Sequence, residues 1–206
     1  MLEVRQLSPE EAKSNLKVLM SLRMRIFQDF PYLYQGTLDS EEKYISPYKD
    51  AKNFVLIACF DGLQVVGCAT GLPLIEASSE IQAPFLSSGV SLSEVFYFGE
   101  SLLLPKYRGQ GIGHRFFDGR ERAAKAINGI KMTCFCNVQR SSDHAMRPQN
   151  YRPLDEFWSR RGYRKVPELV AHLSWVDIGE PKETEKDLVF WVRRWGMDEH
   201  DQRIRQ

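Results

Sequence analysis

The sequence predicts an α/β protein in which helices cover both faces of a mixed sheet. Residues 53–73 contain two strand-like runs around Asp61-Gly62, a dipeptide typical of tight hairpin turns. Residues 95–127 combine a buried strand, a glycine-rich turn and an amphipathic helix. Because hairpins and helical crossovers both occur along the chain, the sheet is expected to contain antiparallel and parallel neighbours.

Hydrophobic spacing and helix caps define the remaining elements. Residues 2–7 alternate between apolar and polar side chains, as a half-buried strand does. Ser8 and Glu11 are placed to form a capping box at the start of a helix that Pro31 would end. The other expected elements are a helix from Asp39 or Ser40 to Ser46, strands at 130–137 and 169–176, and a short helix at 153–161 closed by Gly162. Loops are expected at 75–93, with room for one helical turn, and at 138–152.

The composition is that of an ordinary globular protein, with 206 residues of which 43% are hydrophobic and 27% charged. A net charge of +1 argues against a protein that coats nucleic acid or anionic membrane. No apolar run suits a signal peptide or a bilayer span, so we expect a cytoplasmic protein with neither nucleic-acid nor membrane partners. We expect one domain at 1–176 and a C-terminal extension, 177–206, packed on the same domain.

Four cysteines lie in apolar, strand-like runs: Cys59, Cys68, Cys134 and Cys136. We expect them to be reduced thiols in the core of the protein. The pair Cys134 and Cys136 has no second cluster of ligands nearby in the sequence, so no metal site is expected.

The stretch from Leu102 to His114 carries the main chemical signal. A buried strand ends at Pro105, and three glycines then lead into the amphipathic helix. A helix start offers unpaired N–H groups and the positive end of the helix dipole, which together suit a pyrophosphate. The sequence lacks the Lys-Ser or Lys-Thr of a P-loop, and its glycines are too closely spaced for a dinucleotide fingerprint. A glycine-rich helix cap without a ligand is the alternative.

The segment Arg108-x-x-Gly111-x-Gly113, which follows Leu-Leu-Leu-Pro, resembles the coenzyme A signature of the GNAT superfamily, the Gcn5-related N-acetyltransferases. The resemblance covers residues 2–176 and includes Phe157-Trp158-Ser-Arg-Arg-Gly162-Tyr163, which is similar to a Phe-Tyr-x-x-x-Gly-Phe element of that family. It implies the GNAT fold, with a mixed, mostly antiparallel central sheet, and acetyl-CoA as the cosubstrate.

The resemblance also implies roles for individual residues. Backbone groups of Leu102, Leu103 and Leu104 would pair with the pantetheine arm, as a peptide strand pairs with a sheet edge. This strand would splay from the strand at 130–137 to admit the thioester. The pyrophosphate would be bound by the loop that consists of Arg108, Gly109, Gln110, Gly111, Ile112, Gly113 and His114.

Catalytic groups are harder to assign. Trp158 stands where the family often has a tyrosine that protonates the leaving thiolate, and an indole N–H cannot serve as that acid. Either Tyr151 supplies the proton or no protein acid is needed. Glu100, within an apolar strand, is the candidate base that deprotonates the acceptor amine, and Glu94 is the second choice. The alternative for Glu100 is a structural ion pair or an edge position.

Several charged and aromatic residues are expected to have structural roles only. We interpret Arg120 and Glu121 as a surface pair on a helix, and Trp191 and Trp195 as packed side chains. The loop at 138–152 carries Arg140, Arg147 and Arg152, and we expect it to be a solvated basic loop; the alternative is a contact with the 3′-phosphate of coenzyme A or with an acidic acceptor.

The sequence therefore predicts an acetyl-CoA-dependent N-acetyltransferase that acts on a primary amine of a small molecule or peptide by direct attack on the thioester. The alternatives are a non-catalytic acyl-CoA sensor or interaction module, and an enzyme that transfers a longer acyl chain. Both expected loops would form walls of the acceptor site. A homodimer is compatible with the sequence.

Overall fold

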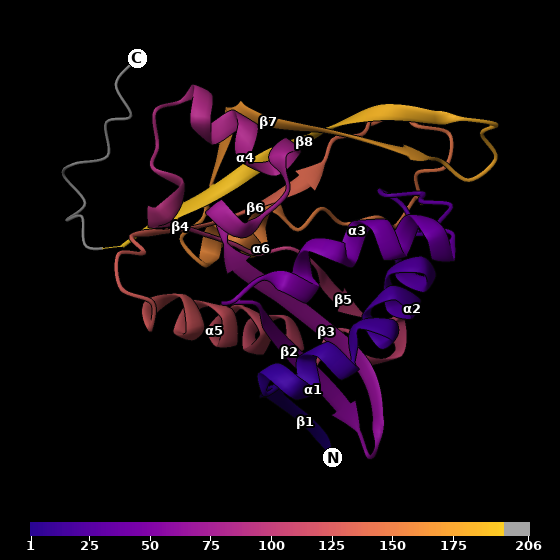
Figure 1. Cartoon of the computed structure of the whole chain (residues 1–206). Helices are drawn as coiled ribbons and strands as arrows, with labels where there is room; N and C mark the ends of the chain where they lie inside the picture. Colours follow the sequence, from indigo (N-terminus) through magenta and orange to yellow (C-terminus); the bar gives the residue numbers. More distant parts are fainter. Residues whose placement is uncertain (196–206) are drawn as a thin grey trace.

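The computed structural model describes residues 1–195, and its centre is one eight-stranded sheet (Figure 1). The strand order is β1-β2-β3-β4-β6-β8-β7, with β5 paired to β3. All pairs are antiparallel except β4 with β6, which confirms a mixed, mostly antiparallel sheet. The strands are β1 (Leu2–Gln6), β2 (Val55–Asp61), β3 (Gln64–Pro73), β4 (Val95–Tyr97), β5 (Ser101–Leu103), β6 (Met132–Val138), β7 (Arg164–Val176) and β8 (Glu183–Arg194).

Helices lie on both faces of the sheet, as predicted. They are α1 (Pro9–Ser14), α2 (Leu16–Ile26), α3 (Leu38–Asp50), α4 (Ser79–Ser87), α5 (Ile112–Lys125) and α6 (Asp155–Arg160). Phe117 of α5 packs on Phe135, with ring centroids 5.6 Å apart, while Phe85 of α4 packs on Phe190 at 4.9 Å. Phe190 pairs with Cys136, the residue after Phe135, and successive strand residues point to opposite faces. No helix among residues 1–195 is long and apolar enough to cross a bilayer.

The N-terminal helices differ from the expected ones. The capping box of Ser8 and Glu11 is present, but the helix is interrupted at Asn15, whose side-chain amide donates to the Glu11 carbonyl at 2.8 Å. The second part, α2, ends at Ile26, before Pro31. The next helix is capped by Thr37 and runs through its internal proline to Asp50. Tyr48, which is buried and stacks on Phe54 at 4.7 Å, offsets the one hydrogen bond that the proline cannot make.

The expected loop at 75–93 is wrong, because this stretch contains α4 between two short 3-10 turns. Only Ile81 and Phe85 of this helix are buried. Two buried apolar residues among serines do not give the hydrophobic periodicity by which a helix is recognised in a sequence. The hairpin is confirmed, although its strands pair through Asp61 and Gln64, so the turn lies one residue later than expected. Strand β7 also begins earlier than expected, with an irregularity at Pro167 that hides its first residues.

The C-terminal segment supplies an internal strand. Strand β8 lies between β6 and β7 and pairs with both, so the sheet runs past the expected domain boundary at residue 176. Trp191 is packed as expected, and its indole N–H donates to Asn137 Oδ1 at 3.0 Å. Residues 196–206 of the expected extension lie outside the described part of the chain.

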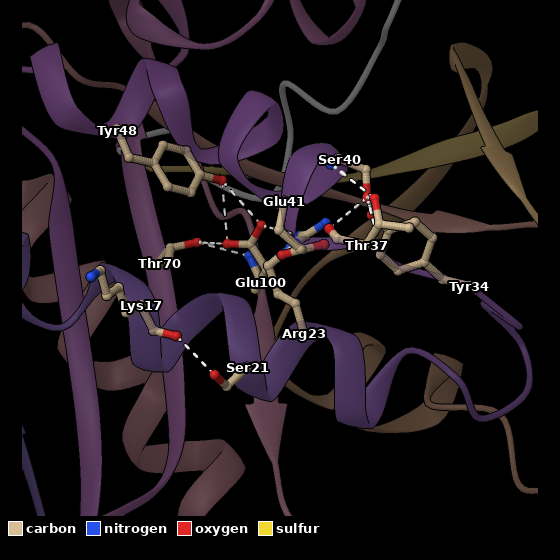
Figure 2. A network of polar contacts seen from close by, with 10 residues as sticks. All are labelled: Lys17, Ser21, Arg23, Tyr34, Thr37, Ser40, Glu41, Tyr48, Thr70 and Glu100. Atoms are coloured by element: carbon tan, nitrogen blue, oxygen red, sulfur yellow. Dashed lines mark hydrogen bonds and ion pairs between the residues drawn. The ribbon is translucent and has the colours of Figure 1, made fainter.

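A buried charge network joins the helices to the bend between β4 and β5 (Figure 2). Arg23 of α2 donates to Glu41 of α3 at 2.7 Å and to Glu100 at 2.6 Å. The hydroxyl of Tyr48 lies 3.2 Å from both carboxylate oxygens of Glu100, and the hydroxyl of Thr70 donates to one of them. An arginine within the apolar face of α2 is thus neutralised by two carboxylates that are distant in the sequence.

On the opposite face, α5 contributes a second buried arginine. Arg120 is 1% exposed and donates to the carbonyls of Thr70 and Glu100 at 3.3 and 3.1 Å. Burial lowers its pKa to about 10, so it is still charged at neutral pH. The adjacent Glu121 is also buried and accepts from Arg193 at 3.0 Å. The expected surface pair is therefore wrong, because α5 packs this side directly onto the sheet.

We predict that Arg23→Met destabilises the fold by about 3–5 kcal/mol, because it leaves two buried carboxylates without their cation. Chemical denaturation of the purified variant measures this change. The matched control is Arg5→Met, which breaks the solvent-exposed pair with Glu11 and should change stability far less. Equal, small effects of the two substitutions would contradict the assignment of Arg23 as a buried anchor.

Candidate active site

The site begins where two neighbouring strands separate. Strand β4 pairs with β6 from Val95 to Tyr97, and the N–H of Phe98 donates to the Cys134 carbonyl at 2.8 Å. Beyond this bond β5 pairs only with β3, while β6 continues along β8. We call the resulting separation of the two backbones, between β5 and residues 135–138 of β6, the gap. The single strand expected at 95–104 is thus divided, with the splay that the resemblance implied.

The bend that opens the gap requires a glycine. A Cβ on Gly99 would lie 2.5 Å from the Thr70 hydroxyl and 2.8 Å from the Tyr48 hydroxyl, far inside normal contact distances. The N–H of Gly99 donates to the Thr70 carbonyl at 3.2 Å, and the N–H of Thr70 donates to Glu100 at 3.1 Å. The chain is therefore drawn toward β3 and away from β6.

The edge of β5 that faces the gap has no strand partner. Leu104 donates to Val66 at 3.0 Å, and Leu102 pairs with Cys68, so both direct their backbone groups toward β3. In an antiparallel pair the intervening residues point the other way, which places the N–H and C=O of Ser101 and Leu103 on the gap side. Of the three leucines predicted to pair with pantetheine, Leu103 is the one whose backbone faces the gap.

The glycine-rich loop presents a row of free amides at the start of α5. No acceptor within residues 1–195 contacts the N–H groups of Gly109, Gln110, Gly111, Ile112 or Gly113. Gly109 and Gly111 have φ of 77° and 74°, values that favour glycine. Five amides and a helix start together suit an anion. The amide of His114 is already donated to Gly111 at 3.1 Å, so this residue is available through its side chain only.

Two cationic or titratable side chains lie beside this loop, as the sequence suggested. The Arg108 guanidinium is about half exposed and donates to the Leu103 carbonyl at 3.2 Å. The His114 ring packs edge-on against Phe157, with centroids 4.9 Å apart. A surface hollow beside His114 is lined by Pro153, Glu156, Phe157 and Arg160. The loop is thus open to a ligand that extends over α6.

Glu100 lies at the bend directly after the closed end of the gap, and its carboxylate is fully bonded. It is 3% exposed, and both carboxylate oxygens accept from donors in the network described above. These contacts favour the structural ion pair over the general base. Glu94 precedes β4 and pairs at the surface with Lys131 at 2.5 Å, so it lies at the end of β4 away from the gap.

A tyrosine and a thiol, Tyr97 and Cys136, meet at the inner end of the gap, and two further tyrosines come from the segments before α3 and α6. The Tyr97 hydroxyl lies 3.5 Å from Cys136 Sγ, and burial raises the pKa of both groups, that of Cys136 to about 12. Burial also raises the pKa of Tyr32, and repulsion from the charges of Cys136 and Glu100 raises it further. Tyr151 packs edge-on against Phe30 at 4.7 Å, and burial raises its pKa as well. All these groups are protonated at neutral pH and can donate hydrogen bonds.

Sequence reasoning missed Tyr32 and the residue that positions it. Arg140 donates to the carbonyls of Pro31 and Tyr32, both at 2.8 Å, and forms a two-fold contact with Asp177. The expectation that Arg140 belongs to a solvated loop is therefore wrong. Arg23 had a usable signal, since an arginine in an apolar stripe needs a buried partner. Tyr32 had none, because its position depends on contacts with residues distant in the chain, Arg140 and Trp175.

No protein-family model matches the sequence, and no curated protein matches it either. Among solved structures, NAA60 of Arabidopsis thaliana in complex with acetyl-CoA is similar over 95% of this chain and 99% of its own, with 16% identity and a TM-score of 0.59. Aminoglycoside acetyltransferase AAC(6')-Ib in complex with coenzyme A is similar over 95% of both chains, with 10% identity and a TM-score of 0.56.

A third solved structure is the loading GNATL domain of CurA from Lyngbya majuscula. It is similar over 94% of this chain and 98% of its own, with 15% identity and a TM-score of 0.56. Identities this low establish a common fold and nothing finer. The chain therefore has the fold of the GNAT acetyltransferases, as the resemblance implied.

Proposed function

We propose that this protein is an acetyl-CoA-dependent N-acetyltransferase. The observation that carries the proposal is the row of five unpaired amides at the start of α5, beside a sheet gap whose β5 edge has no strand partner. The amides suit the pyrophosphate, and the backbone groups of Ser101 and the N–H of Leu103 suit the amide-containing pantetheine arm, whereas the Leu103 carbonyl already accepts from Arg108. Similar solved structures that contain acetyl-CoA or coenzyme A support the same ligand.

The reaction that fits this site is direct transfer. The acceptor nitrogen, as a neutral amine, attacks the thioester carbon at the inner end of the gap. The N–C bond forms, the C–S bond breaks, the amine loses its proton to solvent, and the departing thiolate takes up a proton. Tyr97 lies at the inner end of the gap, is protonated at neutral pH and is the candidate donor there, and Tyr151, also protonated, is retained from the sequence analysis. The acceptor is a primary amine of a small molecule or a peptide.

A non-catalytic acyl-CoA sensor would need the same loop but no open approach to the thioester. Incubation with acetyl-CoA and a panel of amines, followed by thiol detection, separates the two functions. An enzyme releases coenzyme A in proportion to a particular amine, whereas a sensor binds acetyl-CoA without amine-dependent release.

We predict that Gly111→Glu abolishes acetyl-CoA binding in isothermal titration calorimetry, because a carboxylate would occupy the anion site. The matched control is Gly89→Glu. Gly89 has φ of 73°, against 74° at Gly111, and an added Cβ meets no atom within 4 Å at either position. Both substitutions therefore carry a similar backbone strain, about 1–2 kcal/mol.

Only the change at Gly111 should remove binding, while circular dichroism shows both variants folded. Unaltered affinity of folded Gly111→Glu would refute the proposed cofactor site.

We predict that no cysteine carries the acetyl group. Burial raises the pKa of Cys136 from 9.0 to about 12, which reduces its thiolate at pH 8 roughly 10³-fold relative to an ordinary thiol. Intact-protein mass spectrometry after brief incubation with acetyl-CoA should show no acetyl adduct. Alkylation of Cys136 by iodoacetamide should be slow at pH 8 and accelerate continuously toward pH 11, with the urea-unfolded protein as the reactive control. A stoichiometric acyl-enzyme would replace direct transfer by a two-step route.

We predict that Glu100→Gln lowers the melting temperature and leaves turnover per folded molecule within about 3-fold of the original, because the carboxylate acts as an ion-pair partner. Loss of a general base would instead reduce the rate roughly 10²–10⁴-fold, with recovery at high pH. Thermal melts and thiol release with the best amine of the panel measure both quantities. Glu94→Gln is the control at the exposed alternative, and neither property should change there.

A further inference from the structure

The inner end of the gap is closed by a contact between its two walls. Tyr97 is the last paired residue of β4, and Cys136 lies two residues beyond its partner Cys134 on β6. The Tyr97 hydroxyl and Cys136 Sγ, 3.5 Å apart, therefore meet across the point where the strands begin to separate. Both side chains lie on the face of the sheet that α3 and α4 cover, since Phe190 of the same face contacts Tyr97 at 6.3 Å between ring centroids.

The contact is held from behind by other buried groups. Tyr97 is 6% exposed, and Phe190 behind it is fully buried against Phe85 of α4. Cys136 itself is partly exposed, so the firm side of this contact is Tyr97. An extra methylene forced against a buried, packed side chain costs strain. The Tyr97 side therefore limits what enters the inner end of the gap.

The acyl end of a bound cosubstrate would point at this wall. The pyrophosphate site lies at residues 109–113, and the free edge of β5 leads from there back toward Phe98 at the closed end. Residues 98–104 span roughly 20 Å at strand spacing, which is comparable with an extended pantetheine arm. A ligand held by its pyrophosphate and aligned along β5 thus brings its thioester to Tyr97 and Cys136.

We propose that Tyr97 and Cys136 form the acyl-length stop of this protein and restrict it to acetyl-CoA. The proposal rests on the proposed function, because it assigns the acyl selectivity of the same cosubstrate site. An acetyl methyl ends short of the wall, whereas each further carbon of a longer chain must displace the thiol or the phenol. Removal of one heavy atom from the wall should make room for one additional carbon.

Binding of acyl-CoA tests the stop without knowledge of the acceptor. Calorimetry compares coenzyme A, acetyl-CoA, propionyl-CoA and butyryl-CoA. The original protein should bind coenzyme A and acetyl-CoA similarly, and propionyl-CoA about 5- to 150-fold more weakly than acetyl-CoA, the range that corresponds to a methylene forced into a packed site. Butyryl-CoA should bind more weakly still.

Single substitutions then test whether Tyr97 and Cys136 form the acyl-length stop. Cys136→Ala removes one heavy atom and should bring propionyl-CoA to within about 3-fold of acetyl-CoA, with butyryl-CoA still weak. Cys134→Ala is the matched control, because it makes the same change on the same face of β6 where that strand is still paired to β4. It should keep the original selectivity. Tyr97→Phe removes only the hydroxyl from the opposite wall and should relax selectivity in the same direction, which gives a second readout if Cys136→Ala does not fold.

The outcomes separate the two proposals. If the original protein binds all three acyl-CoAs equally, or if Cys134→Ala relaxes selectivity as much as Cys136→Ala, the acyl stop is overturned while the cosubstrate site stands. If neither coenzyme A nor any acyl-CoA binds, the proposed function itself fails.

Discussion

The gap depends on one constraint, which is that the chain must leave β6 directly after Tyr97 and stay bent at Glu100. Two buried arginines impose this bend from opposite faces of the sheet. Arg23 fixes the carboxylate of Glu100 at 2.6 Å, and Arg120 fixes its main-chain carbonyl at 3.1 Å. Because the side chain and the backbone of one residue are both fixed, β5 cannot return to β6. The free edge that the cosubstrate would need is thus a consequence of buried charge.

A buried charge network of this kind adds little net stability, but it selects one packing of the chain over others. Each buried ion costs several kcal/mol in lost hydration, which contacts among Arg23, Arg120, Glu41 and Glu100 offset. The four charges sum to zero, yet Oε1 of Glu41 has no partner within the described residues, so the compensation is incomplete on α3. Any alternative packing of α2 or α5 would leave a bare charge in the core. We therefore interpret the network as the feature that selects the bent arrangement over a continuous strand.

The sequence predicts the parts of this fold that local rules determine. The capping box at Ser8, the hairpin near Gly62 and the glycine-rich start of α5 each depend on residues close together in the chain, and all three are present. The features that the sequence does not predict depend on contacts between residues that are distant in the chain. Helix α4 is stabilised by the burial of Phe85, and the partners of Arg120 lie 20 and 50 residues away. Strand β8 lies between two strands that precede it in the chain, β6 and β7. For the same reason the glycine-rich loop, which we propose as the anion site, was predictable, whereas the contact between Tyr97 and Cys136 was not.

The inner end of the gap is lined by groups that stay neutral, and this limits the chemistry available there. Burial raises the pKa of Tyr97, Tyr32 and Cys136, while the nearest carboxylate, Glu100, is paired to Arg23. An ammonium that enters this region would lose its hydration without gaining a free counter-charge, and burying an unpaired charge costs much free energy. Under direct transfer, the acceptor must therefore release its proton to water before it reaches the thioester. A site of this kind needs no protein base at its centre, and its rate would follow the fraction of neutral amine that the solution supplies.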